Sequence, residues 1–426
     1  MAVGENTFPT LPAVAGFRLG TASAGIKTPG RKDLVVMECA AGSSVVGVFT
    51  RNAFCAAPVQ IAKTHLAQLH LDASSGAQAA NTPCYFVINT GNANAGTGAQ
   101  GCADAMAVCE SVAELAGVEV NKVLPFSTGV IGEPLAVTTI TQGLPAAIGK
   151  LDNNGWQDAA EGILTTDTQP KGAFRQFDIG GKQVTVTGIS KGSGMIKPNM
   201  ATMLGFVATD ADVPQALLQQ YLVEALKRSF NRITVDGDTS TNDSLMLVAT
   251  GQSGVTVDAE GDTESDAAAL LRSAIIEVCE TLAQAIVRDG EGATKFVTIK
   301  VAGGLSSQEC LDVAYTVAES PLVKTALFAS DPNWGRILAA IGRAGITDLD
   351  ADKVKVWLGE VLIAEREGRA ASYTEAAGQA VMDGEEITIH IDLGRAGSTG
   401  GKGVTETIWT TDLSYDYIRI NAEYRS

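Results

Sequence analysis

Residues that commonly bind metal ions are scarce in this sequence. It contains three histidines and seven cysteines, and no two cysteines form a CxxC pair. An odd number of cysteines without paired spacing favours reduced, mostly buried thiols over a disulfide framework or a zinc site. We therefore expect no metal centre, and the cysteine usage is typical of a cytoplasmic protein.

Basic residues are also fewer than acidic residues. Lysine and arginine number 31 against 48 aspartates and glutamates, which gives a formal net charge of −17. Proteins that bind nucleic acids need a basic face, so this balance argues against a nucleic-acid partner. An anionic substrate must instead be held by a few local cationic groups.

Long apolar runs are missing as well. No stretch approaches the ~20 apolar residues that a membrane-spanning helix requires, and residues 1–10 lack the basic and apolar regions of a signal peptide. The overall content of 45% hydrophobic and 19% charged residues is that of an ordinary globular protein. We expect no membrane association, a cytoplasmic location and a chain long enough for two or three domains.

Alternating and helical apolar patterns follow one another along the chain, which predicts a mixed α/β protein. Helices are expected at 103–116, 212–229 and 267–288. The expected strands lie at 34–37, 44–49, 86–88, 123–126, 202–207, 232–235, 296–301, 354–358, 361–364 and 386–393, and the tail from Tyr415 is expected to end a strand.

The most unusual stretch runs from residue 191 to residue 205, near the middle of the chain. Gly192, Gly194 and Pro198 favour a tight, irregular turn. The apolar residues 202–207 that follow are typical of a strand. The pattern therefore places the hydroxyl of Thr202 where a turn enters a buried strand.

The surroundings of Thr202 fit a nucleophile. Ala201 before it is small, which leaves the preceding carbonyl open to attack, and Met203 and Leu204 after it would exclude water. A threonine hydroxyl needs a base, and a chain cut before it would supply its own α-amine, whose ordinary pKa is about 7.7 to 8.0. The alternative from spacing alone is a β-branched strand residue packed in the core.

A second candidate site follows the expected strand at 123–126. Thr128 and Gly129 lie where this strand enters a glycine turn, a context in which backbone N–H groups converge on an anion. In acyl transfer such donors stabilise the tetrahedral oxyanion by roughly 3 kcal/mol each. The alternative is a simple strand end capped by a hydroxyl group.

A third pattern suggests different chemistry. Asp236 and Asp238 follow the expected strand at 232–235, and a strand followed by Asp-x-Asp-x-Thr is also how haloacid-dehalogenase-like phosphatases hold magnesium and a nucleophilic aspartate. Such enzymes also carry a lysine and an acidic pair further along the chain, and this sequence has no convincing counterpart of these residues. The phosphatase is the alternative function.

The segment at 191–205 resembles the signature of the ornithine acetyltransferase/glutamate N-acetyltransferase family of arginine biosynthesis. Other segments, from 47–52 to Asn421, are similar to the same family, so the resemblance covers nearly the whole chain. It implies a precursor that cuts itself between Ala201 and Thr202, giving fragments 1–201 and 202–426. Thr202 would then carry the acetyl group.

The resemblance also implies the rest of the assignment. The fold would be an αββα sandwich with a smaller C-terminal α/β part, and the enzyme a heterotetramer of two copies of each fragment. Acetyl would pass from N2-acetyl-L-ornithine to L-glutamate in a ping-pong reaction without a cofactor, with acetyl-CoA as a donor left open. The implied site consists of the nucleophile Thr202, the oxyanion hole Thr128 and Gly129, and the substrate contacts Thr168 (or else Thr166), Lys191, Glu291, Asn421 and Ser426.

Overall fold

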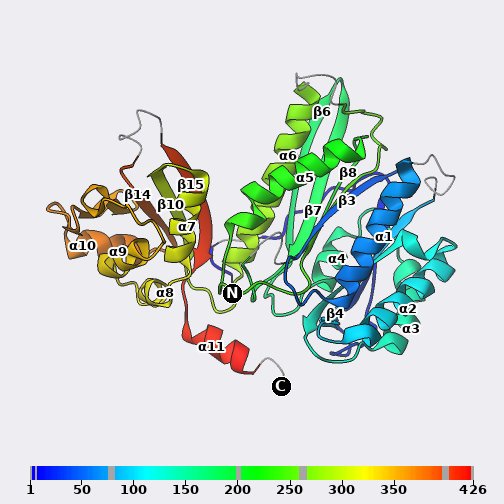
Figure 1. Cartoon of the computed structure of the whole chain (residues 1–426). Coiled ribbons are helices and arrows are strands. Elements are labelled where there is room, and N and C mark those ends of the chain that lie inside the picture. The colour runs from blue at the N-terminus through cyan, green and yellow to red at the C-terminus, as the bar shows by residue number, and fades with distance from the viewer. Residues whose placement is uncertain are drawn as a thin grey trace.

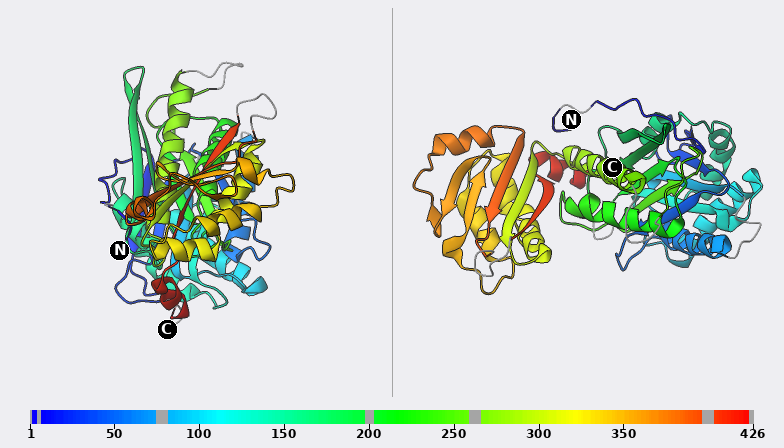
Figure 2. Two further views of the ribbon diagram at one scale, coloured as in Figure 1. Left: turned by 90° about the vertical axis from the view of Figure 1, so that its left-hand side faces the viewer. Right: turned by 90° about the horizontal axis from the view of Figure 1, so that it is seen from above.

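The computed structural model describes residues 2–4, 7–74, 82–197, 203–258, 266–395 and 403–423. Two parts lie side by side in Figure 1, a larger one built from the first two thirds of the chain and a smaller one built from the last third. The right-hand view in Figure 2 shows the same division. Each part has its own β-sheet structure and its own apolar core.

The larger part contains two stacked sheets. The first has the strand order β1-β2-β4-β5, with β1 (Phe17–Ala22), β2 (Leu34–Cys39), β4 (Cys84–Asn92) and β5 (Val123–Val130). The second has the order β3-β9-β8-β7-β6, with β3 (Ser44–Phe49), β9 (Ser244–Ala249), β8 (Leu204–Thr209), β7 (Lys182–Lys191) and β6 (Lys171–Ile179). Only the β4–β5 and β8–β9 pairs of these two sheets are parallel.

Both faces of the first sheet are buried. In β2, Val35 and Met37 pack between the two sheets, whereas Leu34 and Val36 pack under the outer helices. This alternation follows from the two-residue period of a strand. Each such buried aliphatic side chain stabilises the fold by about 1.5 to 3 kcal/mol relative to an exposed one.

Helices cover the outer faces of the two sheets. α2 (Gly98–Ala116) and α3 (Val137–Ile148) pack on the first sheet, and α5 (Gln215–Arg228) and α6 (Asp266–Arg288) pack on the second. Two further helices, α1 (Ala57–Ser74) and α4 (Trp156–Gly162), pack against the strands β5 and β1. The expected αββα layering is thus confirmed, because each sheet lies between the other sheet and a pair of helices (Figure 1).

The smaller part is a single sheet with helices packed against it, as predicted. Its strand order is β13-β12-β11-β14-β10-β15, with β10 (Phe296–Gly304), β11 (Lys355–Leu358), β12 (Val361–Glu365), β13 (Gly368–Arg369), β14 (Glu386–Asp392) and β15 (Val404–Thr411). Its helices are α7 (Ser307–Ala318), α8 (Pro321–Phe328), α9 (Trp334–Gly342) and α10 (Glu375–Met382). A last helix, α11 (Tyr415–Ala422), follows β15.

Two predicted strands are wrong. Residues 232–235 form no strand, because the N–H groups of Thr234 and Val235 donate to two separate segments, at Trp409 and Ile196. The tail is the helix α11, which begins after Ser414, whose hydroxyl accepts a hydrogen bond from the Tyr417 N–H. Among the described residues, no helix has the length and apolar character that a membrane crossing needs.

Candidate functional site

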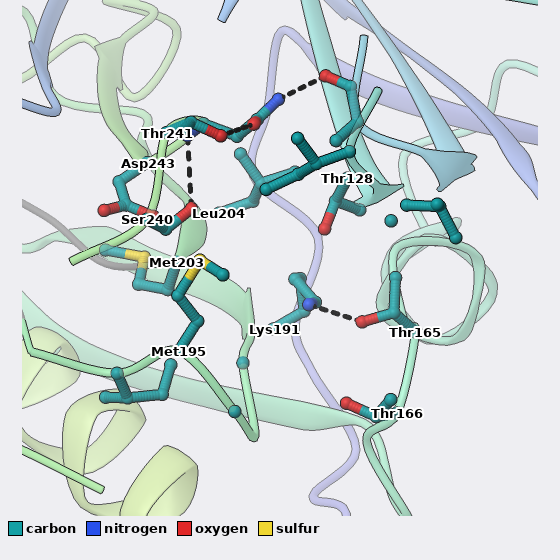
Figure 3. A pocket seen from close by; sticks show the side chains of 18 of the residues that line it. Thr128, Thr165, Thr166, Lys191, Met195, Met203, Leu204, Ser240, Thr241 and Asp243 are labelled. Atoms are coloured by element: carbon teal, nitrogen blue, oxygen red, sulfur yellow. Dashed lines mark hydrogen bonds between the residues drawn. The ribbon is translucent and has the colours of Figure 1, made fainter. Parts of the chain in front are cut away.

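A cavity of about 230 Å³ opens where strand ends of the two stacked sheets meet. Its walls come from the end of β5, the end of β7, the residues before β8 and β9, the loop after α6, and α11. Figure 3 shows Thr128, Lys191 and Met203 around it. Segments that are far apart in sequence therefore converge on one small space. Of the residues predicted from the sequence, the cavity is lined by Thr128, Gly129, Thr166, Lys191, Glu291 and Asn421.

Thr128 and Gly129 lie just before the end of β5, which pairs in parallel with β4 and has an irregular register at Gly91 and Asn92. Gly129 has φ +137°, and a Cβ placed on it would lie 2.3 Å from the carbonyl carbon of Gly91. Only glycine fits this position. A bulge of this kind re-aims the backbone locally, which leaves the end of β5 exposed to the cavity.

The loop before β9 is anchored to the wall that carries Thr128. Asn242 donates through Nδ2 to the carbonyl oxygens of Ala93 (2.6 Å) and Ser127 (2.9 Å). The Ser127 hydroxyl in turn donates to Asn89. The two sheets are thereby fixed relative to each other next to the cavity. Asn242 was not assigned this role from the sequence, since its partners lie more than 100 residues away.

Lys191 supplies positive charge to the cavity. It is the last residue of β7 and only 8% exposed. Its Nζ donates to the Thr165 hydroxyl at 2.6 Å and lies 3.6 Å from Oδ2 of Asp167. Burial alone would raise the pKa of Asp167, but the charges of Lys171 and Lys191 outweigh it and hold that pKa well below its usual range. Asp167 is therefore a carboxylate that orients Lys191.

A buried ion group lies behind Lys191. Lys171 Nζ is 2.7 Å from Asp167 and 2.6 Å from Asp289, and none of the three side chains has appreciable exposure. Thr168 belongs to this group: its N–H donates to Asp289 at 3.0 Å and its hydroxyl donates to the same carboxylate. Thr168 does not line the cavity, whereas the alternative Thr166 does.

Glu291 and Asn421 meet at another part of the cavity wall. Asn421 Nδ2 donates to Glu291 Oε2 at 2.7 Å, and the Glu291 N–H donates to the Ser193 carbonyl at 2.9 Å. A Cβ on Gly194 would lie 2.4 Å from the Glu291 carboxyl group, so a side chain there would displace that carboxylate. The helix α11 thus brings a residue near the C-terminus to the loop after α6.

The chain on both sides of the predicted cleavage point leads into the cavity. Ile196 and Met203 line it. The predicted residues Ala201 and Thr202 themselves, and also Ser426, lie outside the described part of the chain. Their roles therefore remain predictions from the sequence.

Asp243 is a lining residue to which the sequence analysis gave no role. It precedes β9 and is 2% exposed. Burial raises the pKa of its carboxyl well above the usual value, although hydrogen bonds from the Ser240 side chain and the Met203 N–H and the charge of Lys191 act in the opposite direction. Figure 3 shows Asp243 on the same side of the cavity as Met203.

Asp236 and Asp238 do not form a catalytic pair. Asp236 accepts the N–H groups of Met195 (2.6 Å) and Ile196 (2.9 Å), and Asp238 hydrogen-bonds to Asp236 through its own N–H. The carboxylate of Asp236 therefore shapes the turn at 194–196. Across the described residues, no group of three histidine, cysteine, aspartate or glutamate side chains is arranged to hold a metal ion.

Comparison with known proteins gives consistent matches. The ArgJ family matches residues 18–426. The arginine biosynthesis bifunctional protein ArgJ of Pseudomonas fluorescens is 60% identical over 426 residues, which is 100% of both chains. Among solved structures, ArgJ of Bacillus halodurans is 37% identical over 51% of this chain and 97% of its own, with a TM-score of 0.46. An ornithine acetyltransferase of Mycobacterium tuberculosis, complexed with ornithine, is 30% identical over 44% of this chain and 94% of its own, with a TM-score of 0.37.

Proposed function

This chain belongs to the ArgJ family, and from this premise we propose that it is an acetyltransferase of arginine biosynthesis that moves acetyl from N2-acetyl-L-ornithine to L-glutamate. The full-length match to an arginine-biosynthesis protein supports this function and not the magnesium-dependent phosphatase. The use of Asp236 as a backbone acceptor also speaks against the phosphatase.

The nucleophile in this proposal is the Thr202 hydroxyl after the chain has cut itself between Ala201 and Thr202. The new α-amine of Thr202 acts as its base. Support comes from Ile196 and Met203, which flank this segment and both line the cavity. The two products of the cut are the fragments 1–201 and 202–426.

Acyl transfer then proceeds in two half-reactions. Thr202 Oγ attacks the acetyl carbonyl, its proton passes to the α-amine and on to the leaving ornithine nitrogen, and an acetyl ester remains on Thr202. Thr128 and Gly129 stabilise the oxyanion formed in each step, at roughly 3 kcal/mol per donor. Glutamate attacks the ester in the second half-reaction and leaves as N-acetyl-L-glutamate.

The polar groups of the cavity are suited to the two ends of an amino acid. Lys191 pairs with the substrate carboxylate, and Glu291 pairs with an ammonium group. Asn421 orients Glu291 through the 2.7 Å hydrogen bond. As the fourth contact, Ser426 also binds substrate. For the threonine contact we propose Thr166 in place of Thr168, because the hydroxyl of Thr168 is engaged with Asp289.

Three further features complete the proposal. Acetyl-CoA serves as a second acetyl donor to glutamate, in keeping with the word bifunctional in the name of the Pseudomonas relative. The enzyme works in the cytoplasm as a heterotetramer of two fragments of each kind. No organic cofactor or metal ion takes part in the transfer.

The observation that carries the proposal is the convergence of Lys191, Glu291, Gly129 and Met203 on one cavity. The test compares wild type with Thr202→Ala by denaturing electrophoresis and by initial rates with N2-acetylornithine and glutamate. Wild type should give two polypeptides and parallel-line ping-pong kinetics, and the variant one inactive polypeptide. A processed and active Thr202→Ala protein would refute the assignment.

A further inference from the structure

A second cavity, of about 240 Å³, adjoins the candidate site. Gly129 and Val130 at the end of β5 and Thr165 and Thr166 after α4 line both cavities, so the two spaces meet along this edge. The other walls of the second cavity include residues 27–33, between β1 and β2, and parts of β4 and α11. A ligand held in the candidate site can therefore extend into the second cavity.

Two basic side chains, Lys27 and Arg31, line this second cavity. Asp33 is the one acidic side chain among its described lining residues, and its carboxylate accepts the N–H groups of Ala24 at 2.6 Å and Ile26 at 2.7 Å. The negative charge of Asp33 is thus turned to the backbone of its own loop. The charges of the second cavity therefore favour an anionic ligand.

Lys27 lies close to the predicted oxyanion hole. A Cβ on Gly91 would be 2.9 Å from the Cβ of Lys27 and 3.8 Å from its Cδ, so the aliphatic part of Lys27 passes over Gly91. Gly91 is in turn the backbone neighbour of Gly129 across the pair of strands β4 and β5. The Lys27 side chain is thus anchored beside the strand end that carries Thr128 and Gly129.

Arg31 is linked to Lys191 of the candidate site through a single residue. The Nη2 of Arg31 donates to the carbonyl oxygens of Leu164 at 2.7 Å and Thr165 at 3.2 Å. The hydroxyl of the same Thr165 accepts a hydrogen bond from Lys191 Nζ at 2.6 Å (Figure 3). Two cations that are one residue apart suit the two carboxylates of an acidic amino acid.

The two amino acids of the proposed reaction carry side chains of opposite charge. N2-acetyl-L-ornithine has a side-chain ammonium, for which Glu291 supplies a carboxylate, whereas Glu291 would repel the side-chain carboxylate of glutamate. Asp243, whose Oδ2 has no hydrogen-bond partner among the described residues, adds a second acidic group to this cavity. Lys191 is the one cation among the described lining residues, and it pairs with the α-carboxylate. The side-chain carboxylate of glutamate therefore needs a second cation.

We propose, building on the function proposed above, that Lys27 and Arg31 bind the side-chain carboxylate of glutamate and thereby select the acetyl acceptor. In this arrangement the α-carboxylate of glutamate stays on Lys191, and its side chain extends past Thr165 into the second cavity. The side-chain ammonium of N2-acetyl-L-ornithine is repelled by the two cations and turns to Glu291. The two cavities thus separate the acceptor from the donor by charge.

The test compares glutamate with glutamine as acceptor, because glutamine has the same length and a neutral side chain. N2-acetylornithine is the donor, and kcat/KM is measured for each acceptor. Lys27→Met keeps the aliphatic contact with Gly91 and removes one charge, and Arg31→Gln removes the other. Each variant should lower kcat/KM for glutamate by about 10-fold or more, as expected for a lost charge-assisted hydrogen bond. The value for glutamine should change by no more than a few-fold.

Three further variants separate the charge from a merely structural role. Arg31→Lys keeps the positive charge and should retain most of the preference for glutamate. Lys32→Met removes a neighbouring lysine outside the second cavity, whose Nζ lies 2.6 Å from Asp158 and 2.6 Å from Glu161, and should keep the wild-type preference. Lys27→Glu should favour the exchange of labelled ornithine into N2-acetylornithine over glutamate acetylation by about 10-fold or more relative to wild type.

An unchanged preference for glutamate in Lys27→Met and Arg31→Gln, or an equal loss with glutamate and glutamine, would overturn the proposal. A higher KM for acetyl-CoA with an unchanged KM for glutamate would also overturn it, and would assign the two cations to the thioester donor. If wild type transferred no acetyl group from N2-acetylornithine, the proposed function would fail. If wild type were active and the variants kept its preference, this inference alone would fail.

Discussion

Replacing Lys171 by methionine should destabilise the protein strongly although Lys171 does not line the cavity. Lys171 Nζ lies 2.7 Å from Asp167 and 2.6 Å from Asp289, and all three side chains are buried. Removing the cation leaves Asp289 without its ion-pair partner, and leaves Asp167 with only Lys191 at 3.6 Å. Breaking a buried ion pair in this way costs about 3 to 5 kcal/mol. At about 2 °C per kcal/mol for a unit of this size, the melting temperature should fall by roughly 6 to 10 °C.

The difference in melting temperature between Lys171→Met and wild type should depend on pH. In wild type the depressed pKa of Asp167 contributes stability above the ordinary aspartate pKa of about 3.9, and the contribution is lost as pH falls. In Lys171→Met, burial raises the pKa of Asp167 with only the charge of Lys191 left to oppose it. The melting temperature of Lys171→Met should therefore approach that of wild type as pH is lowered from 7 towards 5, because a carboxyl group can then protonate.

Thermal melts of both proteins across this pH range are the assay. Arg175→Met is the matched control, since Arg175 lies on the same strand and forms an ion pair with Glu277 that is about half exposed. Such a pair is worth about 0 to 1 kcal/mol, so Arg175→Met should melt within about 2 °C of wild type. Equal shifts for the two variants, or a gap between Lys171→Met and wild type that does not change with pH, would refute the reasoning.

Three other predictions concern the cavity. Gly129→Ala should lower kcat by about 10²-fold or more while substrate still binds, because a Cβ there meets the Gly91 backbone and displaces an oxyanion donor; an unchanged kcat would contradict this. Thr166→Val should raise KM with little change in melting temperature, whereas Thr168→Val should lower stability by about 1.5 to 3 kcal/mol through the lost bond to Asp289; the reverse pattern would restore Thr168 as the substrate contact. Dialysis against EDTA should leave the initial rate unchanged, since Asp236 accepts backbone N–H groups, and restoration by magnesium would favour the phosphatase.

Much of the layered fold follows from local patterns in the sequence. The helix predicted at 267–288 is α6, because apolar residues recur on one face and Arg288 closes the last turn. The burial of Leu34 to Met37 on both sides of β2 likewise follows from the apolar run that these four residues form. The tail was mistaken for a strand, since its tyrosines and isoleucines are common in strands, whereas the cap at Ser414 starts a helix.

The site was less accessible to sequence reasoning because its geometry depends on distant partners. Thr168 and Thr166 lie in the same polar segment. The Thr168 side chain is turned away from the cavity by its hydrogen bond to Asp289, which is 121 residues away in sequence. In the sequence Lys171 is an ordinary polar residue, and only the folded structure shows that it lies buried between two carboxylates. The unpaired oxygen of Asp243 likewise becomes visible only when β8 and β9 are aligned.

The central claim is that the Thr202 hydroxyl carries the acetyl group between two amino acids. The most direct measurement is tandem mass spectrometry of enzyme mixed with N2-acetylornithine alone and quenched in acid. We predict a fragment that begins at Thr202 and is heavier by one acetyl group on that residue, with loss of this acetyl group when glutamate is added before the quench. An intact chain, or an acetyl group on any other residue, would contradict the account.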